Sequence, residues 1–536
     1  MSTAATLRCA LALAASLVLG ACSAGSGADP HAMRFDLAAD PANLNPLFLH
    51  QDAASVEQQL ARLAFEPFVD LDGRGRPVPG LLASIPTRSN GGVSADGRTI
   101  VYRLRPNVRW SDGVPVTADD VLYTLHAILD PKNPVRSHEG YDLIDAATAK
   151  DSHTVVFHLK HAWAPAVSTY FSYGFAPQFV LPAHVLRKQE PLAQAAFNAA
   201  PSVGDGPFTF VWWHRGDGLR YKANPTYWRG QPKIATLDIK FVPDPQTNLV
   251  LLQSGAIDWN LIAPVQQENL RGNAGIAYAH TPTSVVAGLI INTKHPPFDD
   301  RDVRRALAMT IDRATISQKI TRGAYPVTDM LQPQFSWAYD PQVKEPGFDP
   351  AAADALLDAA GWKRGSDGIR QKNGKRLTLL YVQFPETTTG VRVATFAQSE
   401  LKARGFDVTL KSISNAQLFL PKTGALASGA FDVAYVPFTM GADPDDSSVL
   451  GCGGASNYMR WCDARVDALE KQALLATTQS ERKALYGRIG RIVADEVPVL
   501  YLFNAYYIYA YRTRVSGFAP NPFLPTWNAS AWSLKP

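Results

Sequence analysis

The residues able to do chemistry form no catalytic pattern in this sequence. Gly-x-Ser-x-Gly, which places a nucleophilic serine on a strand-to-helix turn, is absent, and so is the zinc-binding His-Glu-x-x-His. The 11 histidines are scattered, with no pair at metal-ligand spacing on an expected helix. The acid pairs Asp119-Asp120 and Asp445-Asp446 are adjacent, and adjacent side chains do not share a helix face. We therefore expect no enzyme, no metal site and no cofactor.

The N-terminus carries the features of an export signal. One arginine precedes an apolar stretch from Cys9 to Leu19, which is shorter than the ~20 residues that span a bilayer. The stretch ends in Leu19-Gly20-Ala21-Cys22, which resembles the lipobox of bacterial lipoproteins, whose cysteine sulfur takes a diacylglycerol. We predict a signal peptide over 1–21 and a lipidated tether over 22–33. Ordinary secretion with an incidental cysteine is the alternative.

Two of the four cysteines, Cys452 and Cys462, bracket a short Gly-rich loop. In an oxidising compartment such a pair is typical of a disulfide, and closing so short a loop contributes roughly 2–3 kcal/mol of stability. The alternative is a reactive or metal-binding pair, but the loop contains no histidine and no third cysteine. We predict the disulfide.

Composition bounds the remaining possibilities. The chain has 536 residues, 46% of them hydrophobic, with 52 basic and 48 acidic residues and a net charge of +4. This length predicts two to four domains, each able to bury a core. A net charge this small gives no footprint for nucleic acid. No segment after the signal is long and apolar enough to cross a membrane, so we expect an exported monomer held by acyl chains.

The order of predicted elements indicates an α/β protein. Thr117-Ala-Asp-Asp120 is a helix start, with an N-cap followed by acids, for a helix from Val121 to Leu129. Strands are predicted at 99–105, 154–159, 377–382, 408–410, 431–436 and 499–503, and further helices at 247–254, 300–319, 351–360, 391–404 and 480–494. The strand–helix–strand order in the second half indicates an α/β unit there.

An ordered set of motifs resembles the extracytoplasmic solute-binding proteins of family 5, which serve peptide and nickel importers of the ABC type. Trp110-Ser-Asp-Gly-Val-Pro-Val-Thr-Ala-Asp-Asp-Val121 is similar to the signature stretch of that family. The resemblance continues, at the usual spacing, in residues 204–208, 224–228, 254–258, 292–300, 303–306 and 311–313. Most of these motifs have a structural interpretation as turns, helix caps and core aromatics.

The resemblance implies the periplasmic-binding-protein-like II fold (cluster C), in which two α/β lobes close around a cleft and a third domain is inserted. On this chain, domain I would take 34–70, 190–285 and 500–536. Domain II would take 71–189 and domain III 286–499. Ligand would lie between domains I and III.

The resemblance points to a first candidate ligand segment after the first strand of domain I. This segment is Asn45-Pro-Leu-Phe-Leu-His50-Gln51-Asp52. We select His50, Gln51 and Asp52 as candidate ligand-binding residues. A histidine in a loop is also common as a solvated surface residue, and that alternative stays open.

A second candidate segment runs from Ala434 to Pro444. Peptide-binding relatives carry here a tryptophan and, three residues later, an aspartate for the terminal amine of the peptide. Counting from Phe431 puts Phe438 and Gly441 at these positions, and counting back from Pro444 puts Pro437 and Met440 there. Neither register supplies the acid. The candidate ligand-binding residues of this segment are Phe438, Thr439, Met440, Gly441 and Asp443.

The missing acid leaves the ligand open. A buried ammonium without a carboxylate partner is costly, so either Asp443 or Asp52 takes the amine or the ligand has no free amino terminus. We expect a lipid-anchored protein of the periplasm or cell envelope that captures short peptides and delivers them to the permease of an ABC importer. The alternatives are a non-peptide solute, such as a metal chelate or an oligosaccharide, and a peptide receptor or chaperone uncoupled from transport. An exported hydrolase is the competing class.

Overall fold

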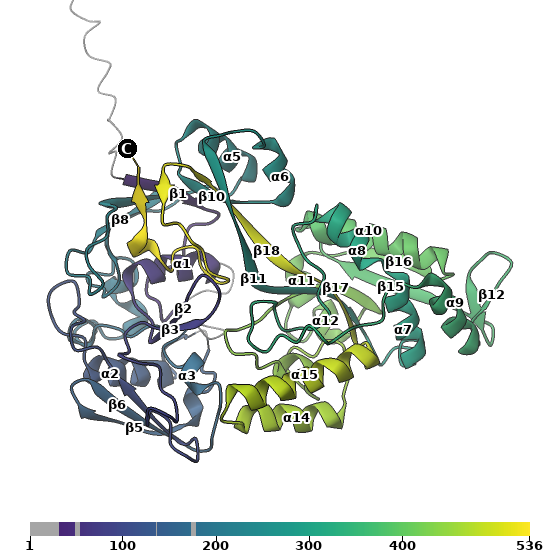
Figure 1. Cartoon of the computed structure of the whole chain (residues 1–536), viewed down its shortest axis with the longest axis horizontal. Coiled ribbons are helices and arrows are strands. Elements are labelled where there is room, and N and C mark those ends of the chain that lie inside the picture. The colour runs from purple at the N-terminus through teal and green to yellow at the C-terminus, as the bar shows by residue number, and fades with distance from the viewer. Residues whose placement is uncertain (1–31, 49–53, 136, 173–177, 536) are drawn as a thin grey trace, which may run out of the picture.

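The computed structural model describes residues 32–48, 54–135, 137–172 and 178–535 (Figure 1). The predicted signal peptide, the Cys22 lipidation site and the candidate residues His50, Gln51 and Asp52 lie outside the described residues. The chain forms two lobes, which Figure 1 shows side by side with two long strands running between them. No helix of the described ranges has the length and apolarity that crossing a bilayer requires.

A single ten-stranded sheet runs through both lobes, in the order β16-β15-β17-β11-β18-β10-β1-β9-β8-β7. Its strands are β1 (Ala32–Leu37), β7 (Phe208–His214), β8 (Gly218–Ala223), β9 (Thr236–Phe241), β10 (Trp259–Ile262), β11 (Ile276–Ile291), β15 (Thr378–Gln383), β16 (Asp407–Ser412), β17 (Val433–Thr439) and β18 (Val499–Arg512). β15 pairs in parallel with both β16 and β17, which confirms the α/β unit predicted in the second half.

The strands β11 and β18 belong to both lobes. The first half of β11 pairs with the second half of β18, from Ile276↔Arg512 to Pro282↔Tyr506. The register then shifts, and the second half of β11 lies between β17 and the first half of β18. Because β17 pairs with β11 only from Val285 onward, Pro282 lacks a partner strand on that side, where its missing N–H is tolerated. This pair of strands is the connection about which the lobes are arranged.

Each lobe has its own hydrophobic core. We call first lobe the part whose core is built from residues 33–259 and 509–532, and second lobe the part whose core is built from residues 286–503. A smaller cluster at α5 (Pro245–Ser254), α6 (Pro264–Asn269) and the adjoining halves of β11 and β18 flanks the first lobe. The first core draws on residues of both predicted domain I and predicted domain II. The domain boundaries therefore stay predictions.

The predicted helix after the Trp110 motif is confirmed. It is α2 (Ala118–Leu129), whose N-cap is Thr117, and the Asp120 carboxylate accepts a hydrogen bond from the Thr117 backbone N–H at 2.9 Å. A three-stranded sheet, β4-β6-β5, packs beside it. The other elements of this part are α1 (Ala54–Ala64), β2 (Val69–Leu71), β3 (Pro77–Pro79), β4 (Thr99–Arg103), β5 (Ile144–Asp151), β6 (Thr154–Leu159), α3 (Ala166–Thr169) and α4 (Ala183–Leu186).

Helices cover the sheet of the second lobe. The single helix predicted over 300–319 is wrong, because α7 ends at Thr310 and Asp312 caps a new short helix at the Thr315 backbone N–H. A π-helical turn, Ile316–Ile320, follows. The elements are α7 (Arg301–Thr310), α8 (Arg313–Thr315), α9 (Pro350–Ala359), β12 (Lys363–Arg364), β13 (Arg370–Lys372), β14 (Lys375–Arg376), α10 (Thr388–Ala403), α11 (Asn415–Phe419), α12 (Ala425–Ser428), α13 (Ser447–Leu450), α14 (Ala464–Leu475) and α15 (Gln479–Glu496). The short strands β19 (Val515–Ser516) and β20 (Ser533–Leu534) pair near the C-terminus.

The motif Gly204-Asp-Gly-Pro-Phe208 has a structural role at the end of α1. Asp205 accepts a hydrogen bond from the Glu66 backbone N–H at 3.1 Å, and Gly206 N–H donates to the Ala64 carbonyl at 2.8 Å. A Cβ on Gly206 would lie 2.5 Å from the Ala64 carbonyl carbon, so only glycine allows this close approach. This motif therefore positions α1 in the first lobe.

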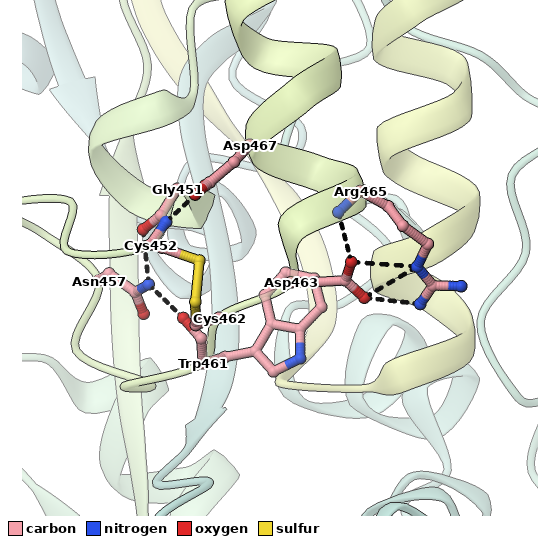
Figure 2. The surroundings of a disulfide bond; sticks show 8 residues. All are labelled: Gly451, Cys452, Asn457, Trp461, Cys462, Asp463, Arg465 and Asp467. Atoms are coloured by element: carbon pink, nitrogen blue, oxygen red, sulfur yellow. Dashed lines mark hydrogen bonds and ion pairs between the residues drawn. A yellow bond between two sulfur atoms is a disulfide. The ribbon is translucent and has the colours of Figure 1, made fainter.

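The predicted disulfide is present. Cys452 and Cys462 are joined in the loop before α14, as Figure 2 shows. The Cys452 backbone N–H donates to Asp467 on α14 at 2.7 Å, and the Asn457 side chain donates to the carbonyls of Gly451 and Trp461 (Figure 2). The loop is thus closed covalently and tied to the helix that follows it.

Candidate functional site

The sheet topology directs the loops of both lobes toward the same space. β1 pairs in parallel with β9 and β10, and the C-terminal end of β10 pairs with β18 at Ile508, near the point where β18 passes between the lobes. β17 runs the opposite way, and its last residue, Thr439, pairs with Val285. The carboxyl ends of the parallel strands in each lobe therefore point at the other lobe. In open α/β sheets, ligands bind beyond these ends.

The predicted residues of the second segment lie at this edge, with different exposures. Phe438 and Met440 are buried among hydrophobic residues of the second-lobe core, whereas Thr439 is exposed and Gly441 is half-buried. The Met440 backbone N–H donates to the Ser284 carbonyl on β11 at 2.9 Å, which continues the ladder past the end of β17. The structure thus holds this segment against the strand that joins the lobes.

Asp443 is paired with an arginine that the sequence analysis did not select. Both guanidinium NH₂ groups of Arg482, on α15, donate to the two Asp443 carboxylate oxygens, at 2.8 and 2.5 Å. The side chains are 7% and 11% exposed, so the pair is almost dry. Burial alone would lower the pKa of Arg482, but the charge of Asp443 and its hydrogen bonds hold that pKa above its usual value. Asp443 is therefore already neutralised within its own lobe.

The two lobes touch each other around this pair. The Ser168 hydroxyl, on α3 of the first lobe, donates to Asp443 Oδ2 at 3.1 Å, and Ala164 N–H donates to the Leu474 carbonyl at 2.8 Å. The rings of Phe335 and Phe523 pack edge-to-face with centroids 5.7 Å apart. Figure 1 shows α3 beside the end of α15. The structure therefore shows the lobes in contact.

A cavity of about 320 Å³ lies between the lobes next to Asp443. Its first-lobe wall consists of residues from 69–100 and 162–172, and its second-lobe wall of Trp337, residues 442–443 and residues 475–482. Most of these side chains are apolar. The first-lobe wall of the cavity comes mainly from predicted domain II. The family resemblance, in contrast, placed the ligand between domains I and III. That placement of the ligand stays a prediction.

Acidic residues gather behind the second-lobe wall. Burial raises the pKa of Asp445. Hydrogen bonds that Asp445 accepts from Ser447 lower this pKa, and the charge of Asp443 raises it, so that the pKa stays above its usual value. Across the lobe contact, burial and then the charges of Asp445 and Asp443 raise the pKa of Glu139. Arg482 is the cation that offsets this negative charge. No group of three or more histidine, cysteine or acidic side chains within the described ranges is placed to hold a metal ion.

The sequence contains a signal for Arg482 that the sequence analysis did not use. On α15, Arg482 shares a face with Leu485, Tyr486 and Ile489, which are all buried. A charged residue at an apolar position of an amphipathic helix needs a buried partner. The partner, Asp443, lies 39 residues earlier, and its identity follows only from the fold.

With the fold and this geometry in place, comparison with known proteins identifies the family. Residues 76–459 match the family described as bacterial extracellular solute-binding proteins, family 5 Middle. This match covers most of the chain, and the protein belongs to that family. The family resemblance and the fold class predicted from the sequence are confirmed.

Individual relatives agree with this assignment. Di/tripeptide-binding protein 2 of Pseudomonas aeruginosa (strain UCBPP-PA14) is 29% identical over 481 residues, which are 83% of this chain and 86% of that protein. The oligopeptide-binding protein AppA of Bacillus subtilis, solved in complex with a nonapeptide, has the same fold at a TM-score of 0.74 and 22% identity. NikZ of Campylobacter jejuni, solved with Ni(L-His), also has this fold, with a TM-score of 0.77 and 23% identity. Each of the two structures covers 94% of this chain and is itself covered to 99%.

Proposed function

We propose that this protein captures short peptides between its two lobes and delivers them to the permease of an ABC importer. The observation that carries the proposal is the topology: the parallel strands of both lobes end facing one another across β11 and β18. A solute held there contacts both lobes only when they are together, so it stabilises the closed arrangement by its differential affinity. The peptide-binding relatives favour a peptide as that solute.

An extended peptide suits such a site for a physical reason. Its backbone N–H and C=O groups pair with protein backbone regardless of side chains, which gives broad selectivity. We propose Thr439 and Gly441 as backbone partners, because Thr439 ends β17 and Gly441 follows it, past the residues at which β15 pairs with β17. Phe438, Met440 and Asp443 would shape the same wall, and His50, Gln51 and Asp52 would contact the ligand from the first lobe.

We also propose that the mature protein is exported and lipid-anchored through Cys22. The Leu19-Gly20-Ala21-Cys22 sequence and the extracellular family support this. Cys22→Ser is expected to remove labelling by a radioactive or clickable fatty acid and to move the protein from the membrane fraction to the soluble fraction. Labelling that persists in Cys22→Ser would contradict the anchor.

Calorimetric titration tests the solute class. The full mature chain is titrated with di- and tripeptides of varied side chains and, separately, with Ni²⁺ and histidine. We expect several unrelated peptides to bind with comparable affinity. Binding of the nickel–histidine chelate with no heat from any peptide would overturn the peptide assignment and favour the ligand seen in NikZ. Loss of peptide uptake on deleting the gene would support the coupling to an importer, and unchanged uptake would contradict it.

A further inference from the structure

The cavity between the lobes has a lining that specifies one chemical class of guest. It has about 320 Å³ and is bordered by residues of both lobes. Ile85, Val93, Ile100, Trp163, Val167 and Trp337 are among its apolar walls. Because the two walls come from different lobes, a group that fills the cavity contacts both only while the lobes are together.

Among the described residues, the cavity lining offers a cation no carboxylate that lacks a partner. Among the described residues that line it, Arg88 and Arg482 are the basic ones and Asp443 is the carboxylate. Asp443 accepts two hydrogen bonds from Arg482 and lies 3.1 Å from the Ser168 hydroxyl, so its oxygens are already occupied. An ammonium placed here would meet a carboxylate that already has a partner. Leaving a buried charge without a partner is strongly unfavourable.

We propose that this cavity receives an uncharged apolar group attached to the solute, such as the acyl chain of an N-acylated peptide, and excludes a free amino terminus. This inference rests on the proposed function, because it names which peptides the protein would prefer. The apolar lining supplies the driving force by removing the chain from water. The Asp443–Arg482 pair then acts as a neutral wall of the cavity.

The volume sets the size of the guest. Ligand pockets begin at about 300 Å³, so this cavity accommodates a short chain or a single ring and not an additional run of residues. Each methylene that leaves water for the cavity is expected to raise affinity about four-fold. The rise in affinity for each added methylene should stop once the acyl chain is longer than the cavity can hold.

A matched ligand series tests the inference. The mature protein is titrated calorimetrically with dialanine and with its N-acetyl, N-butanoyl and N-hexanoyl forms. We expect affinity to rise along the acyl series and the free-amine form to bind more weakly than the hexanoyl form. If the free-amine form binds as well as the hexanoyl form or better, this inference is overturned while the proposed function stands. If no form binds, the proposal of a peptide solute fails with it.

A filled cavity provides the protein-side test. Ala476, which lines the cavity directly after α14, is replaced by phenylalanine, and Ala468, exposed on α14, is replaced in the same way as the control. Ala476→Phe should remove the gain from the acyl chain, so that the hexanoyl and free-amine forms bind this variant with comparable affinity. Ala468→Phe should bind the whole series like the parent. An unchanged acyl gain in a folded Ala476→Phe variant would overturn the inference.

Fluorescence locates the chain without altering the fold. Trp163 and Trp337 line the cavity, whereas Trp212 on β7 does not. A 6-bromohexanoyl dialanine should quench tryptophan emission, and Trp163→Phe and Trp337→Phe should each reduce the quenched fraction. Trp212→Phe is the control and should not reduce it. Quenching that is the same in Trp163→Phe, Trp337→Phe and the parent would place the chain elsewhere and contradict the inference.

Discussion

Arg482 holds Asp443 by two hydrogen bonds, at 2.8 and 2.5 Å, and Asp443 in turn accepts a hydrogen bond from Ser168 of the other lobe. One carboxylate thus serves both the interior of the second lobe and the contact between the lobes. Asp443 directly precedes Pro444 and lies outside both positions that the two registers of the family pattern assign to the acid. A group that takes part in lobe contact is not free to neutralise an amine.

Removing Arg482 should destabilise the second lobe. Arg482→Ala leaves the buried Asp443 carboxylate without its cation, which typically costs about 3–5 kcal/mol. Urea denaturation measures this loss. The matched control is Arg491→Ala on the same helix, because Arg491 pairs with Asp340 at an exposed site and should cost at most about 1 kcal/mol. Equal losses in the two variants would contradict the structural importance of the pair.

Ser168→Ala should weaken closure of the lobes. The variant removes a hydrogen bond between lobes, which contributes about 1 kcal/mol and corresponds to roughly a five-fold loss of solute affinity. Small-angle scattering should show a larger radius of gyration at subsaturating solute. Ser254→Ala is the control, since the Ser254 hydroxyl donates to the Leu251 carbonyl within its own helix. A change of the same size in Ser254→Ala would assign the effect to something other than the lobe contact.

Removing the disulfide should lower stability without changing solute selectivity. Cys452→Ser combined with Cys462→Ser releases a short loop and is expected to cost roughly 2–3 kcal/mol in urea denaturation. The relative affinities for different peptides should stay the same, because the bridge lies in the loop before α14 and not at the cavity. An altered ranking of peptides would show that this loop shapes the site.

Asp36 should make stability depend on pH. Burial raises the pKa of this carboxyl on β1 from 3.8 to about 7, against lowering hydrogen bonds from its own backbone N–H and from Asn260. Between about pH 4 and pH 7 the folded protein therefore retains a proton that the unfolded chain has released. The free energy of unfolding should therefore fall as pH rises through this window. The total fall is at most about 1.4 kcal/mol for each unit by which folding raises the pKa of Asp36.

Melting temperatures at pH 5 and pH 8 measure this dependence. Asp36→Asn should reduce the drop between the two pH values, because the amide does not ionise. Asp145→Asn, at an exposed position, should leave the drop unchanged. A drop in Asp36→Asn as large as in the parent would assign the pH dependence to other groups.

Local signals predicted the elements that local chemistry determines. Thr117 and Asp120 mark the start of α2, and Gly255, with a φ of 78°, ends α5 where the sequence predicted. The predicted helix over 300–319 failed because Ile311 adopts an extended conformation and Asp312 starts a second cap, a local choice that apolar periodicity does not reveal.

Long strands and distant partners were beyond the sequence. The sequence analysis predicted no strand over β11, since Pro282 and the polar residues around it interrupt the alternation on which strand prediction depends. It selected Asp443, but the fold alone shows that Arg482 and Ser168 converge on it. Neither partner is close to Asp443 in the chain. Contacts of this kind follow from the arrangement of the lobes.

Native mass spectrometry of the protein purified from its own cells tests the central claim most directly. A broadly selective peptide trap should carry a series of bound masses that fragment as short peptides, and mild unfolding should release them. The described lobe contacts predict that Ser168→Ala and Arg482→Ala retain less of this cargo than the parent. A single bound mass that is not a peptide, or a protein that is empty from every preparation and binds no added peptide, would contradict the account.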